Sequence, residues 1–280
     1  MKKVLLASSI VLFALVLLSA FQKEKTNDFT SPAGEIQQQY IQQLQDFAQS
    51  AERLHGIATQ LNSTTKSQAM LTAALAETRI AYKKTEHFAA HLDPFFNKKH
   101  FNGAPLLSLE PNSPQLTVVE PEGLQVLEEL IHSEEVLDEK EKIIGLSQKL
   151  VAKADEFQRF QGRVYLTDRL FFEAARFQLV RLFTLGLTGF DSPAALNSIP
   201  ETYASLASIA DSFTLYKVLL ERQEKQLYAT IKDDFNEALD YLNKNQNFDQ
   251  LDRLHFLKEF VNPLFAGLLD AQLTLNIETY

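Results

Sequence analysis

The hydrophobic positions of this chain recur with helical spacing over most of its length. The clearest case is residues 34–62, where apolar residues alternate spacings of four and three, and Gln and Glu fill many of the other positions. This spacing places the apolar residues on one face of a helix. After a break at 63–65, the same pattern continues over 66–92 and stops before Pro94. The short connection predicts two antiparallel helices packed as a hairpin.

More helices are predicted further along the chain. Their expected ranges are 121–136, 138–160, 167–187, 199–244 with a break near Ala210, and 249 onwards with a kink at Asn262-Pro263. No segment of useful length alternates with period two, so the fold class is all-α. We expect a helical bundle of about eight helices in two sub-bundles that share one core, residues 33–162 and 163–280.

The segment 97–119 does not follow the helical pattern. It contains Asn102-Gly103 and three prolines, which do not sustain a helix. A loop of about twenty residues is unusual inside a compact domain and favours a functional or partner-facing role. The alternative is that it simply crosses the end of the bundle.

The N-terminus has the pattern of a targeting segment. Met1-Lys2-Lys3 precedes an apolar run from Val4 to Phe21. We interpret residues 1–25 as a signal peptide for export to the periplasm, or as an anchor in the inner membrane. The shortness of the run favours export over a permanent span. Contact with a membrane is expected only through this segment.

Composition excludes several classes of protein. The chain has no cysteine, so it has no disulfide, no site for lipid attachment and no C-x-x-C-H motif for covalent haem. Its formal net charge of −9 makes nucleic acid a poor partner and a basic protein or a cation a better one.

The candidate chemistry lies between residues 79 and 130. Arg79, Tyr82 and Glu86 share one face of a predicted helix. A later helix begins with Gly123-x-Gln125-x-x-Glu128. Because the neighbours of both glutamates are apolar, we predict one buried polar cluster in which Arg79 neutralises the carboxylates. Such a cluster either fixes the register of the helices or retains a ligand or cation site.

These residues resemble the imelysin-like family, whose hallmark is Gly-x-His-x-x-Glu after an upstream aromatic residue and Glu. Gln125 stands where that family has His. These residues and the segments 184–191 and 261–264 are similar in sequence to the helical region at the N-terminus of bacterial dihaem cytochrome c peroxidases. The resemblance covers the chain from about Arg79 to its end.

This resemblance implies a fold and a function. It implies an imelysin-like bundle that serves as a periplasmic accessory or docking module of a cytochrome c peroxidase system, without being the catalyst itself. The partner would be a dihaem cytochrome c peroxidase or a small cytochrome c, and the haem would lie in that partner chain. The alternative is an imelysin-like metal- or haem-binding protein of iron uptake, and a peptidase is a weaker one.

The metal-binding potential of the chain is limited. A carboxamide is a weak ligand for first-row metals, so Gln125 argues against the family's metal motif. The weak candidates for a metal ion are Glu86, Glu128, Glu129 and His132. Glu129-x-x-His132 has the spacing of di-iron bundles, but it adjoins a polar run, and those sites need inward-facing ligands. No catalytic residue and no covalent cofactor are assigned.

Two further histidines are expected on a solvent-exposed helix face and not in a metal site. His87 and His91 lie one helical turn apart, and a solvated helix face is expected for them in preference to a surface metal clip.

The absence of cysteine generates the first testable prediction. The purified protein should be colourless and should not turn over peroxide, because no thiol is present to attach haem. Absorption spectra before and after acid–acetone extraction, together with a peroxidase assay, test this. A Soret band that survives denaturing extraction would contradict it.

Overall fold

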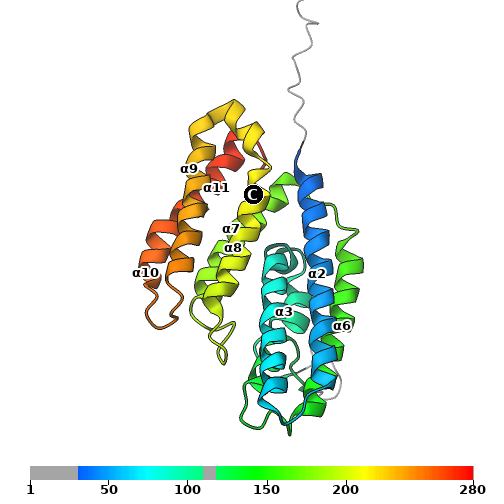
Figure 1. Ribbon diagram of the computed structural model, residues 1–280. Helices are drawn as coiled ribbons and strands as arrows, with labels where there is room; N and C mark the ends of the chain where they lie inside the picture. Colours follow the sequence, from blue (N-terminus) through cyan, green and yellow to red (C-terminus); the bar gives the residue numbers. More distant parts are fainter. Residues whose placement is uncertain (1–30, 110–117, 280) are drawn as a thin grey trace, which may run out of the picture. The chain divides into compact units, whose positions relative to one another are not determined.

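The computed structural model describes residues 31–109 and 118–279, and the described residues from Pro32 onwards form one compact unit (Figure 1). The predicted signal peptide or anchor and part of the long loop lie outside the described residues. In the described part of the chain, no helix is both long enough and apolar enough to cross a membrane.

The all-α prediction is confirmed. The first hairpin consists of α2 (Ala33–Thr59) and α3 (Thr65–Leu92), close to the predicted ranges. The side chain of Thr64 caps α3 by accepting a hydrogen bond from the backbone N–H of Ser67 at 3.2 Å. Helix α6 (Lys140–Gln161) lies along α2 and completes a three-helix layer (Figure 1).

The second half of the chain supplies four more long helices and a short one. The long helices are α7 (Asp168–Arg181), α8 (Ser198–Thr214), α9 (Lys217–Lys244) and α11 (Asn262–Thr274), and the short helix is α10 (Arg253–Phe256). Helix α8 packs against α3 on one side and α9 on the other, while α11 packs against α7 and α9 (Figure 1). The contact between the two halves of the chain therefore runs mainly through α3, which meets both α7 and α8.

The long loop contains more structure than its sequence predicts. The short helix α4 (Pro94–Phe96) precedes it, and it begins with a π-helix, η1 (Asn97–Phe101). Two short antiparallel strands follow, β1 (Ser108–Leu109) and β2 (Val118–Val119). The rings of Phe47 and Phe157 hold Phe101 edge-on, with centroids 5.1 and 5.2 Å away, and so fix η1 on the core.

The helix predicted from Pro121 begins later, as α5 (Leu124–Ile131). Gly123 has a positive φ of 99° and pairs with Asn102 in an isolated antiparallel bridge. A Cβ at this position would lie 2.7 Å from the carbonyl oxygen of Phe101. The glycine of the motif is therefore required by its backbone conformation and by the close approach of another chain segment.

The other predicted interruptions also have physical causes. The kink at Asn262-Pro263 takes the form of a π turn, η3 (Leu257–Val261), which accommodates a residue without an N–H. A second π turn, η2 (Leu182–Gly186), ends α7. The break predicted near Ala210 falls instead between α8 and α9, and Glu224 adds a non-helical position inside α9.

Candidate functional site

One face of α3 is polar and buried. Arg79, Tyr82, Lys83 and Glu86 follow one another at helical spacing, and each side chain is almost completely excluded from solvent. This face packs against α5, α7 and α8, so its charges must find partners within the protein. We call this group of side chains and its partners the buried network.

Arg79 is the centre of the buried network. Its Nε and Nη2 atoms form a bidentate pair with the carboxylate of Glu201 on α8, at 2.5 and 3.0 Å. Nη2 also donates to the backbone carbonyl of Asp191 at 2.5 Å. Nη1 lies 3.0 Å from Oε2 of Glu128 on α5, an ion pair without the alignment of a hydrogen bond. A single guanidinium thus joins α3, α5, α8 and the segment before α8.

Glu128, the acidic residue of the sequence motif, binds backbone amides. Its Oε1 atom accepts hydrogen bonds from Ser192 Oγ at 3.1 Å and from the N–H groups of Ala194 and Ala195 at 3.0 and 2.8 Å. The carboxylate therefore holds the 192–195 segment against α5. Its second oxygen faces Arg79.

Lys83 and Glu86 extend the buried network to α7. The Nζ atom of Lys83 lies 2.6 Å from Asp191 Oδ2 and 3.1 and 3.0 Å from the two oxygens of Glu86. Glu86 also accepts a hydrogen bond from Gln178 Nε2 on α7 at 2.7 Å. The hydroxyl of Tyr82 lies 3.1 Å from Glu86 Oε1. Both oxygens of this carboxylate are therefore engaged by side chains of the protein.

Gln125 lies at the edge of the buried network. It is buried, and within the described residues its Nε2 atom contacts Asn102 Oδ1, at 3.5 Å. Asn102 Nδ2 in turn lies 3.5 Å from Glu86 Oε1. Both contacts are at the limit of hydrogen bonding. Gln125 therefore approaches the carboxylates through Asn102 and does not bind them directly.

The network carries excess negative charge. In the described part of the chain, its carboxylates outnumber its cationic side chains by four to two: Glu86, Glu128, Asp191 and Glu201 against Arg79 and Lys83. Burial lowers the pKa of Arg79, but Glu201 and Glu128 more than offset this, so that its pKa lies above its ordinary value. Burial likewise opposes the charge of Lys83, and the carboxylates of Asp191 and Glu86 raise its pKa above the usual range. Both cations therefore stay charged.

Glu201 is the carboxyl group most affected by burial. Burial raises its pKa, although the attraction to Arg79 acts in the opposite direction. A proton on this carboxyl group would reduce the excess negative charge of the network.

The structure brings together most of the residues that the sequence singled out. Arg79 and Glu128 form an ion pair, and Tyr82 and Glu86 share a hydrogen bond on the same face of α3. Gly123 supports the start of α5 through its backbone alone.

Two metal candidates do not join this group. Glu129 and His132 are exposed. Glu129 follows Glu128 in α5 and faces solvent, while the ring of His132 contacts the carbonyl oxygen of Glu128 at 2.9 Å. The four weak metal candidates therefore do not form one site.

Sequence reasoning missed several members of the buried network. Lys83, Gln178, Asp191 and Glu201 each bind a residue of the predicted cluster. Lys83 was detectable, because it lies four residues after Arg79 and three before Glu86. The others come from elements more than ninety residues away, and no local pattern marks them.

The remaining histidines do not assemble a metal site in the described residues. No group of three or more His, Asp or Glu side chains there has the geometry to hold a metal ion. The expectation that His87 lies on a solvated face is wrong: the side chain is buried, and burial lowers its pKa to about 3. His55 contacts Ser147 Oγ at 3.0 Å.

Comparison with known proteins identifies the fold. No protein-family model and no curated protein matches the chain. Among solved structures, an imelysin-like protein from Psychrobacter arcticum 273-4 is similar, with a TM-score of 0.61 and 14% sequence identity. The similarity covers 87% of this chain and 90% of that one. The fold is therefore imelysin-like, while the likeness to the peroxidase-associated region stays a prediction from the sequence.

The geometry of the buried network predicts a large effect of Arg79→Leu. Removing the guanidinium leaves the carboxylates of Glu201 and Glu128 buried without their counter-ion, which should lower the free energy of unfolding by about 3–5 kcal/mol. Urea denaturation measures this. Arg222→Leu, at an exposed position on α9, is the matched control and should change stability by less than about 1 kcal/mol. Equal effects of the two substitutions would contradict the central role of Arg79.

Proposed function

We propose that this chain is an exported accessory module that docks onto a haem protein of a cytochrome c peroxidase system. The partner is a dihaem cytochrome c peroxidase or a small cytochrome c, and the redox chemistry takes place in that partner. Export to the periplasm through the N-terminal segment is part of the proposal. The observation that carries it is the engagement of the motif carboxylates by groups of the chain itself.

The buried network supports a structural role for the motif. Glu128 binds the backbone of the 192–195 segment and faces Arg79, and Glu86 binds Lys83 and Gln178. A carboxylate with these partners has few lone pairs left for a metal or a substrate. The network instead fixes α3, α5, α7 and α8 relative to one another, which makes the protein a stable platform for contacts at its surface.

The segment around the long loop supplies a surface for such contacts. We call residues 94–109 and 118–123 the arm. Its exposed apolar side chains are Phe95 (73% exposed), Leu106 (72%), Leu107, Leu109 and Val118. Single exposed apolar residues are common on proteins, but five of them in one short segment favour a partner-binding role.

The base of the arm is held in place. The ring of His100 binds the carboxylate of Glu122, and Lys149 Nζ lies 3.4 Å from the same carboxylate. Asn102 and Gly123 pair through their backbones next to this contact. A fixed base reduces the conformational entropy that the arm would lose on binding.

The nature of the partner follows from the sequence resemblance and from charge. The module that this chain resembles occurs in the same chain as a peroxidase. The net charge of −9 favours association with a partner whose surface is basic.

Substitutions in the arm test the proposal. The parent chain should bind the dihaem peroxidase encoded by the same genome, and Leu106→Ser with Leu107→Ser should weaken binding about tenfold or more, because buried apolar anchors dominate interface energies. Isothermal titration calorimetry measures the affinity, and thermal melting confirms folding. Leu254→Ser, at a position 63% exposed on α10, is the control and should bind like the parent.

Two results would overturn the docking proposal. One is the absence of binding by the parent chain to either the peroxidase or a small cytochrome c. The other is unchanged binding by the doubly substituted arm.

A metal- or haem-binding role in iron uptake is the second candidate. The imelysin-like fold and the excess of carboxylates in the buried network favour it. Under this alternative, Glu86 or Glu128 would exchange an internal partner for a cation.

Gln125→His separates the two candidates. The substitution restores Gly-x-His-x-x-Glu and places an imidazole near Glu86, so the variant should bind zinc or iron more tightly than the parent. We expect weak binding by the variant and none by the parent, because groups of the chain already engage Glu86 and Glu128. Elemental analysis and calorimetry measure this, with Gln125→Asn as the control. Tight, stoichiometric binding by the parent would favour iron uptake over docking.

A further inference from the structure

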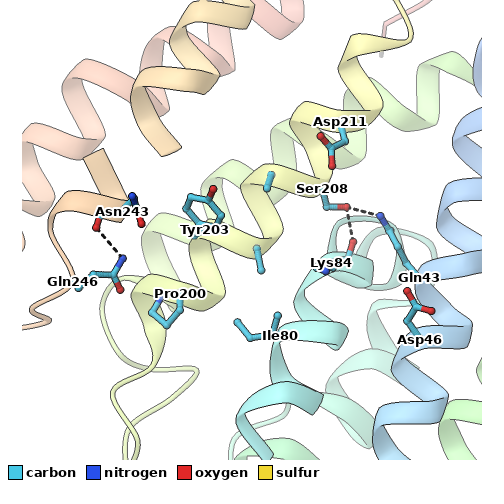
Figure 2. Close-up of a pocket in the computed structure, with 12 residues that line it drawn as sticks. Gln43, Asp46, Ile80, Lys84, Pro200, Tyr203, Ser208, Asp211, Asn243 and Gln246 are labelled. Carbon is cyan, nitrogen blue, oxygen red and sulfur yellow. Dashed lines mark hydrogen bonds between the residues drawn. The ribbon is translucent and has the colours of Figure 1, made fainter. Parts of the chain in front are cut away.

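A groove runs along α8, between this helix, the α2–α3 hairpin and the end of α9. Its cavity volume is about 590 Å³, within the range of small-molecule sites. Figure 2 shows that α8 forms its floor, between α2 and α3 on one side and the end of α9 on the other. The floor consists of Pro200, Tyr203, Ala204, Ala207, Ser208 and Asp211.

The spacing of the floor residues explains the groove. They recur every three or four residues and so share one face of α8, and Glu201 and Ser205 are buried on the adjoining face. Ala204 and Ala207 have the smallest side chains that a helix readily accepts. Larger side chains of the flanking helices, among them Gln43, Ile80 and Lys84, line the sides of the groove.

One wall of the groove is fixed by hydrogen bonds. Gln43 Nε2 on α2 donates to Ser208 Oγ at 2.9 Å, and this hydroxyl donates to the backbone carbonyl of Lys84 on α3 at 2.9 Å (Figure 2). Three helices are joined at this point, so the groove is formed before any ligand enters.

The two ends of the groove differ in charge. Asp211 lies at the C-terminal end of the floor, Lys84 and Asp46 lie on the wall that α3 and α2 form, and none of the three forms an ion pair within the described residues. Tyr203 and Asn243 lie at the other end, which has no charged group in its lining (Figure 2). The floor spans about 16 Å at 1.5 Å per helical residue.

We propose that this groove binds a small zwitterion of the amino-acid class, one with an ammonium and a carboxylate at its head and an uncharged tail. The carboxylate pairs with Lys84, the ammonium pairs with Asp211, and the tail packs on Tyr203 with its polar atoms near Asn243. A simple cation would face the repulsion of Lys84, and a simple anion would face two carboxylates. A molecule with both charges pairs with both signs of charge in the lining.

Calorimetric titration of the full protein with free amino acids tests the proposal. L-Phenylalanine and L-glutamine are the probes, and N-acetyl-phenylalanine and phenylalanine amide are the controls that lack one charge. Saturable binding of a free amino acid is expected, and each control should bind about tenfold more weakly, the effect of losing a hydrogen bond to a charged group.

Variants locate the binding. Lys84→Gln should weaken binding about tenfold, whereas Lys258→Gln at an exposed position on η3 should not. Ala207→Leu should fill the groove and abolish binding, with Ala152→Leu on the exposed face of α6 as its control.

Three results would overturn the proposal. The first is no binding of either amino acid, and the second is equal binding of the forms that lack a charge. The third is binding that survives Ala207→Leu in a variant whose thermal melting shows it to be folded.

Discussion

The ion pair between Arg79 and Glu201 is the interaction on which the rest of this structure depends. Buried charges are stable only when every one of them has a partner, and here those partners come from several separate elements. If α8 shifted along α3, Arg79 would lose Glu201 and the carbonyl of Asp191 together. The network therefore selects one arrangement of helices among the many that a purely apolar interface would allow.

The same constraint changes the meaning of the sequence motif. In this chain Gly123 permits a close backbone approach, and Glu128 binds the backbone before α8. Gln125 lies at the edge of the network and is connected to Glu86 through Asn102. The polar groups of the motif thus bind other parts of the chain and connect its two halves.

Helix α8 links the interior of the protein to its surface. One face carries Glu201, which binds Arg79, and the adjoining face carries Ala204 and Ala207, which form part of the floor of the groove. Ser208 joins this second face to α2 and α3. The shape of the groove therefore depends on the buried network, because both are set by the position of one helix.

The sequence by itself determined the helical class, the first hairpin and the polar face of α3, because these depend on spacing within a single element. It also placed Glu86, Glu128 and Arg79 in apolar surroundings. Only the tertiary structure decided which partners they have: Asp191 and Glu201 lie 108 and 122 residues from the cations they bind. It likewise decided that Glu129 and His132 face solvent and that a groove opens along α8. Local patterns record which face of a helix is buried, whereas the identity of the group opposite depends on how distant elements pack.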